Sequence, residues 1–420
     1  MRFLRRSGFL VFVAFILSFE LGCGDQYRPV ANPVLGPGGQ PQSTHYAYVL
    51  NFNAAGNGST SQMDVSGDTL TQVQSQGPGS VFEALLPPNN VRLFVANSAG
   101  DSVSTFTPTL GNALTTINLL SGSHPVALAA TQSATMYVLN QGPNSMCLNS
   151  GSVSAINIST SAVTATTCVG VNPTQLVQAA NGGQLYIINQ GDNSISVISP
   201  NGLVAGTPIT GLDLNLVYLV ASSDGNYIFA IARGDGKTPG ALDIISTFSS
   251  TQAARMPLGV SPDFATLDPN LNRLYVTNAG DGTVDVLDTS NVNVTASPPI
   301  PSLANPPVSI GTGSGPVGVT PLANGKLFYV ANAGNNTVSV VSATSFQVLM
   351  TIALPAGSNP VWIASDPTST KVFVANQGTS STAIIQTVNN AIASSVASPA
   401  QDPNCTSSCA LQQPMMILTQ

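Results

Sequence analysis

The chain has 420 residues, of which only 7% are Asp, Glu, Lys or Arg, and it carries a net charge of -7. Ordinary globular proteins have roughly 25% charged residues, so hydroxyl and amide groups must dominate this surface. Nucleic-acid binding depends on clustered Lys and Arg, whose contacts with phosphates release counterions. The 11 Lys and Arg residues form no such cluster, and we expect no nucleic-acid partner.

The N-terminal segment has the pattern of an export signal. Three arginines precede an apolar run from Phe9 to Phe19, which is too short for a comfortable bilayer span. The following Glu20-Leu21-Gly22-Cys23 resembles the lipobox of bacterial lipoproteins, although Glu20 stands where that motif usually has Leu. We predict a signal peptide over residues 1–22, a lipid on Cys23 and a tether over 23–44, which together imply a lipid-anchored protein of the bacterial cell envelope. The alternative is an ordinary signal peptide, with Cys23 a stray thiol.

One sequence phrase recurs along the rest of the chain. A short β-branched or aromatic run ends in Asn, and a Gly/Asn/Asp loop leads to a second alternating run, as in Leu274–Asn278 followed by Thr283–Leu287. We call the last residue of the first run the marker position. It recurs at intervals of about 43 to 54 residues, at Asn51, Asn97, Asn140, Asn189, Ala232, Asn278, Asn332 and Asn376. That interval is typical of one four-stranded blade of a β-propeller.

Each repeat predicts four strands in a fixed order. An inner strand comes first and often begins with Pro, as in Pro125–Leu128, because the ladder has not started there. A turn, the marker strand, an alternating third strand and a Thr/Val-rich outer strand such as Ala162–Thr166 follow. We expect the marker Asn side chain to bond the backbone of the next loop as an Asx turn.

The two ends of the repeat region complement each other. The first unit begins at Tyr46 with a marker strand and no inner strand, whereas Gln413–Leu418 resembles an inner strand with nothing after it. We predict that the C-terminal strand completes the first blade and removes an open edge. The fold class is therefore all-β, a single propeller over residues 45–420 with eight blades, or seven if the irregular unit around Arg233 is an insertion.

Four cysteines remain after Cys23. Cys147 and Cys168 fall in one repeat, and Cys405 and Cys409 close a small loop near the C-terminus. In an exported protein, local disulfides within each pair are the simplest interpretation. A zinc site is the less favoured alternative, because neither pair has further ligands at suitable spacing.

The repeats resemble the YVTN β-propeller family, of which Tyr275-Val276-Thr277-Asn278 is a literal instance. The resemblance covers nearly everything after Tyr46 and implies a propeller fold. That family and its neighbours include surface-layer proteins, lipoproteins and lactonase-like enzymes, so the resemblance leaves function open. No local motif can be matched position by position to a lactonase site.

Candidate site residues follow from the path of the chain within a blade. Loops entering the inner strand and loops following the marker strand belong on one face, which predicts a common rim of charged residues. These residues are Asp101, His124, Asp192, Arg233, Asp235 and Asp281. Turn chemistry accounts for the Asp residues equally well, whereas Arg233 and Asp235 stand out because the repeat loses its Asn beside them.

The weak candidates for catalysis are Glu83, His124, Arg233 and Asp235. Glu83 lies in the apolar inner strand Val81–Leu85, where we expect it to face the channel because burial would penalise its charge. We expect no cofactor and no metal, although calcium in the Asp/Asn loops is a conceivable alternative.

The leading functional hypothesis is a noncatalytic binding or scaffold lipoprotein of the cell envelope. A monomeric disc would contact a protein or glycan through its loop-lined face. The alternative is a lactonase-like hydrolase at the mouth of the central channel.

Overall fold

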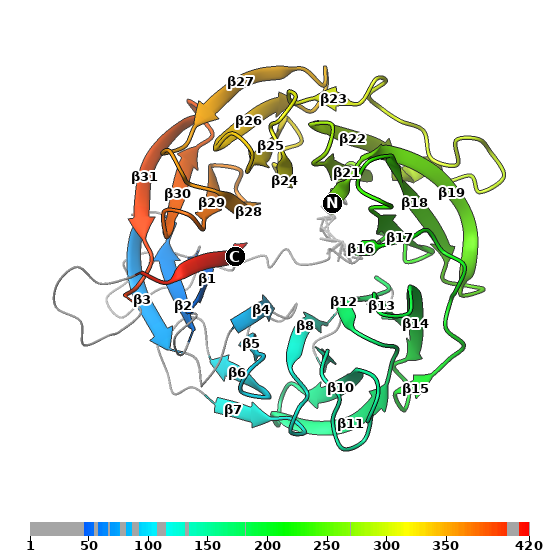
Figure 1. Ribbon diagram of the computed structural model, residues 1–420. Helices are drawn as coiled ribbons and strands as arrows, with labels where there is room; N and C mark the ends of the chain where they lie inside the picture. Colours follow the sequence, from blue (N-terminus) through cyan, green and yellow to red (C-terminus); the bar gives the residue numbers. More distant parts are fainter. Residues whose placement is uncertain are drawn as a thin grey trace, which may run out of the picture.

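The computed structural model describes residues 46–53, 58–65, 68–75, 81–85, 92–106, 115–130, 134–180, 182–268, 270–400 and 411–419. They form a ring of eight four-stranded antiparallel sheets around a central axis (Figure 1). The predicted all-β propeller with eight blades is confirmed. The irregular fifth unit is a complete blade rather than an insertion, so the seven-blade alternative is wrong.

Blades 1 to 4 contain the strands up to Ala205 together with the C-terminal strand. Blade 1 contains β1 (Tyr46–Phe52), β2 (Ser59–Asp64), β3 (Thr69–Ser75) and β32 (Gln413–Thr419). Blade 2 contains β4 (Val81–Leu85), β5 (Leu93–Asn97), β6 (Ser102–Phe106) and β7 (Thr115–Asn118). Blade 3 contains β8 (Pro125–Ala129), β9 (Thr135–Asn140), β10 (Ser152–Asn157) and β11 (Ala162–Cys168). Blade 4 contains β12 (Pro173–Gln178), β13 (Leu185–Asn189), β14 (Ser194–Ser199) and β15 (Val204–Ala205).

The other four blades follow in chain order. Blade 5 contains β16 (Leu216–Ala221), β17 (Tyr227–Ala232), β18 (Pro239–Ser246) and β19 (Thr251–Val260). Blade 6 contains β20 (Pro262–Asp268), β21 (Arg273–Asn278), β22 (Thr283–Asp288), the short 3-10 helix η1 (Thr289–Asn291) and β23 (Val308–Ser309). Blade 7 contains β24 (Pro316–Pro321), β25 (Leu327–Asn332), β26 (Thr337–Ser342) and β27 (Val348–Ala353). Blade 8 contains β28 (Pro360–Ser365), β29 (Lys371–Asn376), β30 (Ser381–Gln386) and β31 (Ala391–Ala397).

The inner strands share a bulge near their start. In blade 8, Pro360 pairs with the marker Asn376 and Trp362 pairs with Ala375, so one residue is skipped. The ladders of the other blades shift at the equivalent point. Because a bulge leaves backbone groups out of the ladder, Pro can open these strands without removing a needed N–H donor.

The marker Asn side chains are buried, and six of the seven bond the next strand. Asn376 is the exception, because Ala383 stands at the third-strand position that carries the acceptor in those six blades. The Nδ2 of Asn97 donates to Ser104 Oγ at 2.7 Å, and the Nδ2 of Asn332 donates to Ser339 Oγ at 3.0 Å. Similar bonds to third-strand hydroxyl or carboxylate groups are made by Asn51, Asn140, Asn189 and Asn278. The predicted Asx turn is therefore wrong: the amide joins the second and third strands of its own blade.

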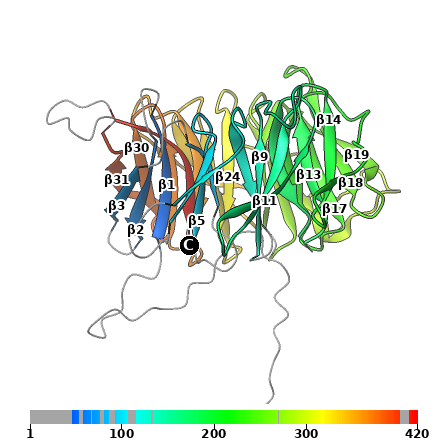
Figure 2. The same cartoon turned by 90° about the horizontal axis from the view of Figure 1, so that it is seen from below.

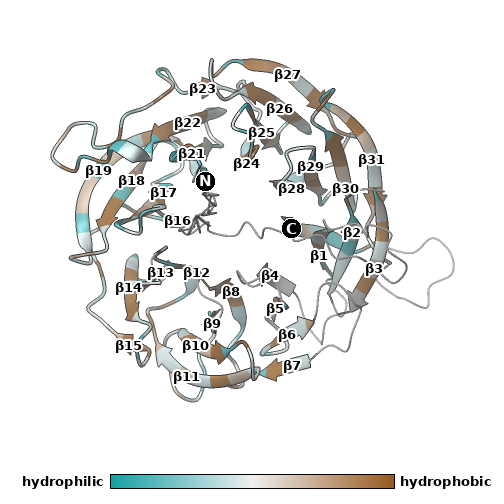
Figure 3. Cartoon of the chain, turned by 180° about the vertical axis from the view of Figure 1, so that it is seen from behind, coloured by the Kyte–Doolittle hydropathy of each residue, from teal (hydrophilic) through white to brown (hydrophobic). Residues whose placement is uncertain are grey.

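The hydrophobic core is divided among the junctions between blades. The described residues form eight apolar clusters, one at each junction between consecutive blades. An aromatic ring two residues into each marker strand lies at 5% exposure or less, as with Tyr186 and Phe373. Apolar strand segments recur around the whole ring in Figure 3. Each blade therefore needs its neighbours to bury its surface.

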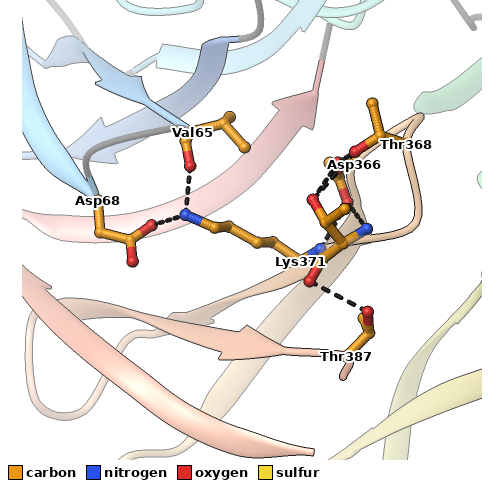
Figure 4. Close-up of polar contacts among 7 residues, drawn as sticks. Val65, Asp68, Asp366, Thr368, Lys371 and Thr387 are labelled. Atoms are coloured by element: carbon orange, nitrogen blue, oxygen red, sulfur yellow. Dashed lines mark hydrogen bonds and ion pairs between the residues drawn. The ribbon is translucent and has the colours of Figure 1, made fainter. Parts of the chain in front are cut away.

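The C-terminal strand closes the ring as predicted. β32 pairs antiparallel with β1, beginning at Ala47 opposite Thr419. The indole N–H of Trp362 in blade 8 donates to the Ile417 carbonyl at 3.1 Å. Lys371 bonds the Val65 carbonyl and the Asp68 carboxylate of blade 1 (Figure 4). The two chain ends are thus joined by strand pairing and by side chains from the last blade.

The disulfide between Cys147 and Cys168 is present, with a Cα–Cα distance of 5.5 Å. It links the loop after β9 to the end of β11 and confirms that predicted pair. The predictions for Cys23, for the Cys405–Cys409 pair and for the tether concern residues outside the described part of the chain. Within the described residues, no helix is both long and apolar enough to cross a membrane.

Candidate functional site at the loop face

The loops that enter the inner strands and the loops that follow the marker strands lie on one face of the disc, which we call the loop face. The turns between the first and second strands and between the third and fourth strands lie on the opposite face, which we call the turn face. Figure 2 shows loops along both edges of the disc. On the loop face, the Gln141 N–H donates to the His124 carbonyl at 3.0 Å, and the Gly142 N–H donates to the Ser123 carbonyl at 2.9 Å. These bonds join the loop after a marker strand to the loop entering the inner strand, as predicted.

The glycine two residues after the marker is required by this close approach. A Cβ on Gly142 would lie 2.1 Å from the Gly122 carbonyl oxygen, and one on Gly378 would lie 2.0 Å from that of Gly357. Backbone at such distances leaves no room for a side chain. The Asn-x-Gly sequence therefore encodes both the strand-joining amide and the loop contact.

Three of the predicted rim carboxylates hold neighbouring loops. Asp101 accepts the N–H groups of Gly122 at 2.7 Å and His124 at 2.8 Å. Asp192 accepts the Val171 N–H at 3.2 Å. Asp281 accepts the Val260 N–H at 2.8 Å. Each carboxylate thus fixes the loop entering its own blade, or in blade 2 the loop leaving it.

Hydroxyls of the third strand orient two of these carboxylates. Ser194 Oγ donates to Asp192 at 2.7 Å, and Thr283 Oγ1 donates to Asp281 at 2.7 Å. The three rim carboxylates belong to blades 2, 4 and 6, so the geometry distributes them around the ring rather than gathering them in one pocket. This is the arrangement expected of turn chemistry.

His124 is exposed and held by backbone contacts. Its φ is +47°, and its Nδ1 lies 3.1 Å from the Ser98 carbonyl oxygen and 3.8 Å from Asp101 Oδ1. The ring thus faces a carboxylate that already accepts two backbone N–H groups. The Nδ1 side of the ring therefore helps to order the loop. A catalytic role for His124 stays a prediction.

Arg233 and Asp235 point to different partners. Arg233 forms an ion pair with Asp263 in the inner strand of blade 6. Asp235 accepts N–H groups from Lys237 at 2.9 Å and Thr238 at 2.8 Å. These bonds, led by that of the Thr238 N–H, lower the pKa of Asp235. The two residues that stood out in the sequence are therefore not in contact with a common site.

Glu83 lies in an inner strand as predicted, because β4 pairs with β5 and places it opposite Ala96. Its side chain is outside the described part of the structure, so the expected channel-facing position stays a prediction. The equivalent inner-strand position in blades 5, 6 and 8 is aromatic. Tyr218 and Phe264 have ring centroids 4.9 Å apart, and Phe264 packs edge-on against Trp362 at 5.5 Å.

These aromatic side chains skip one blade. Phe264 belongs to blade 6 and Trp362 to blade 8, while the equivalent residue of blade 7 is Gly318. Because Gly318 has no side chain, the two rings can meet in front of blade 7. Trp362 thus takes part in ring packing and in the bond to β32, which accounts for it without a bound sugar.

The fifth blade contains a buried carboxylate that sequence reasoning missed. Asp243 occupies the third-strand position that is Ser in five other blades, and it is fully buried. It accepts the Asp213 N–H at 3.0 Å and the Gln252 side-chain amide at 2.5 Å. Burial, with the nearby charge of Asp213, raises the pKa of Asp243 to about 6.

Asp213, whose side chain is partly exposed, lies between Asp243 and Arg255. Arg255 holds it with two bonds, Nε–Oδ2 at 2.5 Å and Nη2–Oδ1 at 2.7 Å. The sequence signal was the missing Asn at the marker position Ala232. Asp243 accepts the N–H of the entering loop, as the equivalent Asp285 accepts that of Gly259 in blade 6.

No metal centre is formed by the described residues, among which no three His, Cys, Asp or Glu side chains come together. The loop face does expose apolar side chains over three consecutive blades. They are Met146 (56% exposed), Leu148 (73%), Val171 (46%) and Leu214 (67%). The turn face also exposes Phe248 (100%) and Val388 (88%), so what distinguishes the loop face is that such side chains occur on three consecutive blades. An exposed apolar surface of this kind is a candidate contact surface.

The chain matches no protein-family model and no curated protein. Solved structures share its architecture. The dihydro-heme d1 dehydrogenase NirN, in complex with DHE, has a TM-score of 0.68 at 10% identity, over 94% of this chain and 79% of that one. Apo AztD from Citrobacter koseri has a TM-score of 0.58 at 13% identity, over 90% and 98%.

Hydrazine synthase from Kuenenia stuttgartiensis is also similar, with a TM-score of 0.53 at 18% identity, over 73% of this chain and 95% of that chain. Identities this low establish a common fold and nothing more. The propeller fold is therefore shared by proteins as different as these, and function must be argued from the residues of this chain.

Proposed function

We propose that this protein is a noncatalytic binding or scaffold lipoprotein of the bacterial cell envelope, built on a YVTN-type propeller. One observation carries the proposal. On the loop face, the rim carboxylates Asp101, Asp192 and Asp281 accept loop N–H groups, while apolar side chains such as Leu148 and Leu214 are exposed. Such a surface offers apolar contact area to a partner, while its carboxylates are occupied in hydrogen bonds that hold loops in place.

The proposed export and lipid anchor are supported by the N-terminal sequence and by one disulfide. The apolar run and Cys23 have the order of a lipoprotein signal. The Cys147–Cys168 disulfide supports an oxidising compartment. A lipid on Cys23 would hold the disc near a membrane, where its partner is an envelope protein or glycan.

Photo-crosslinking in cells that produce the full chain tests the contact face. A photoreactive residue replaces Leu148 or Leu214 on the loop face, and the matched control replaces Phe248, which is 100% exposed in the β18–β19 turn on the turn face. We expect one defined adduct from the loop-face positions and none from Phe248. Equal adducts from all three positions, or none from any, would contradict the proposal.

Two further measurements separate this function from the alternatives. Acyl labelling should mark the wild type but not Cys23→Ala, and an unlabelled wild type would refute the anchor. A panel of lactones should show no turnover by the purified protein. Turnover that disappears in His124→Ala or Arg233→Ala, with an unchanged melting temperature, would instead establish a hydrolase.

A further inference from the structure

One position links each blade to the next on the turn face. It lies five residues before the marker, at the start of the marker strand, and we call it the clasp position. A long side chain occupies it in seven blades, as Tyr46, Arg92, Gln184, Tyr227, Arg273, Leu327 and Lys371. In blade 3 the clasp position is Thr135, whose side chain has only two heavy atoms beyond Cβ.

Four of the clasp residues, Arg92, Gln184, Arg273 and Lys371, reach the same element, which is the turn between the third and fourth strands of the following blade. Arg92 Nη1 donates to Ser161 Oγ at 2.6 Å and to the Ile158 carbonyl at 3.3 Å. Arg273 Nη1 donates to the Ala343 carbonyl at 2.6 Å. Gln184 accepts from Ser250 Oγ at 2.7 Å. Together with Lys371, these contacts fill the space between neighbouring blades.

At the junction of blades 3 and 4 that space is open. A cleft of about 320 Å³ is lined by Thr135, Tyr137, Gln178, Gly182, Pro200 and Asn201. Pro200 and Asn201 form the β14–β15 turn, which is the element that a longer clasp would reach. The cleft therefore exists where the clasp is too short to fill it.

The aromatic ring of blade 3 is accordingly less covered than its equivalents. Tyr137 is 5% exposed, whereas the ring at this position in each of the other seven blades is at 0%. Desolvation by burial still raises the pKa of the Tyr137 phenol. A phenol held neutral at the edge of a cleft can both donate and accept a hydrogen bond.

The lining is polar but contains no charge. It offers a hydroxyl, a phenol, two carboxamides and a proline ring. The Gln178 amide is fixed by bonds to the Gly182 and Gly183 carbonyls, both at 3.2 Å. A charged ligand would lose hydration without gaining a counter-charge, and a purely apolar ligand would displace water from the Thr135 hydroxyl and the Asn201 carboxamide without replacing its hydrogen bonds.

We propose that this cleft binds one neutral sugar residue, either a free hexose or the end of a glycan. A polyhydroxylated ring combines apolar C–H faces with many hydroxyls, which matches the Pro200 ring and the exposed edge of the Tyr137 phenol together with the amide and hydroxyl groups. The volume lies at the lower end of the range for small-molecule sites, roughly 300 to 1,000 Å³, so a single ring fits better than a large cofactor. The site is on the turn face and does not depend on the loop-face contact proposed above.

Ligand-observed NMR with the full chain tests the proposal. The probes are glucose, galactose, mannose and N-acetylglucosamine, each as the free sugar and as its methyl glycoside, with glucuronate and glucosamine as charged comparisons. We expect at least one neutral probe to bind in the millimolar range or more tightly, and the charged probes to bind more weakly. Preference for the methyl glycoside over the free sugar would indicate a glycan end, and the reverse a free hexose.

Thr135→Arg is the decisive variant, because it supplies the long clasp side chain that Arg92 and Arg273 provide elsewhere. It should weaken binding at least about tenfold while leaving the fold intact. Asn201→Glu, at an exposed lining position, is a second variant with the same expected direction. The matched control Thr207→Arg adds an equal charge at an exposed residue that does not line the cleft.

Two results would overturn the inference. Either no neutral sugar binds the wild type in the millimolar range, or a bound sugar is retained equally by both cleft variants and by Thr207→Arg. Because crosslinking at Leu148 and Leu214 reads the other face, its outcome remains interpretable in either case.

Discussion

Blade 1 is assembled from both ends of the chain, whereas blades 3 and 4 are built from consecutive segments. At the junction between blades 8 and 1, Lys371 bonds Val65 and Asp68, and Trp362 bonds Ile417. At the junction between blades 3 and 4, the clasp position is Thr135 and a cleft remains. The Cys147–Cys168 disulfide lies on the loop-face side of blade 3.

This difference shows how a ring of similar repeats distributes its constraints. Where the chain ends meet, side chains from the last blade hold the first one in place. In blade 3, where the chain is continuous, a disulfide fixes a loop on the loop face, and the clasp position on the turn face has the short side chain of Thr135. The space that remains beside Thr135 is the cleft for which we propose a sugar ligand.

The largest effect should come from removing the closing strand. Deleting Pro414–Gln420 takes away the partner of five residues of β1 and exposes its edge. At about 1 kcal/mol for each net hydrogen bond, the loss is on the order of 5 kcal/mol before apolar burial is counted. We expect aggregation or a markedly lower melting temperature by calorimetry. Deleting Gln420 alone is the control, and unchanged melting and solubility of the longer deletion would refute the closure.

Removing the disulfide should come next in size. Cys147 and Cys168 are 21 residues apart, and closing a loop of that length stabilises the folded state by about 3 kcal/mol in the chain-entropy model. The double variant Cys147→Ser, Cys168→Ser should lower the denaturant midpoint by a corresponding amount. A matching midpoint for the wild type under reducing conditions serves as the control. If neither treatment moves the midpoint, blade 3 does not rely on this bond.

Lys371→Met tests the clasp at the ring closure. The side chains of Lys371 and Asp68 are 12% and 19% exposed, so the pair is mostly shielded from water. Without the ammonium group, the Asp68 carboxylate and the Val65 carbonyl lose this bonding partner, which should lower the free energy of unfolding by about 2 kcal/mol. Urea unfolding measures the change, with Lys371→Arg as the charge-conserving control. Full stability of Lys371→Met would show that strand pairing alone closes the ring.

Asp243 provides the smallest effect and one that depends on pH. Its folded pKa, about 6, lies above the unfolded value near 3.8, so the folded protein binds the extra proton between those values. Stability from this group is therefore full at low pH and is lost as pH rises through about 6. Asp243→Asn should flatten the melting temperature between pH 4 and 6 relative to wild type. Parallel pH profiles for the two proteins would contradict the assigned pKa shift.

Much of the fold could be predicted from the sequence, because the marker strands recur and the two ends complement each other. The role of the marker Asn could not, since its amide can bond a loop or a strand with similar energy. What decides is the spacing of third-strand hydroxyls, with Ser102 and Ser104 five and seven residues after Asn97.

The candidate site was harder to predict for a related reason. An Asp in an Ala-Gly-Asp-Gly loop has the same sequence whether it orders a loop or binds a ligand, and only the bond from the Val260 N–H to Asp281 distinguishes the two. The cleft left no direct signal either. Thr135 is unremarkable alone and becomes informative only when the seven longer side chains at the same position are aligned with it.

Site-resolved amide hydrogen exchange can show whether the loop-face carboxylates hold loops rather than perform chemistry. In the wild type, the N–H groups of Val171 and Val260 should be protected by Asp192 and Asp281. Asp192→Ala should accelerate exchange at Val171 alone, and Asp281→Ala at Val260 alone. If protection at both amides is unchanged in both variants, the carboxylates do not hold these loops and are free for another role.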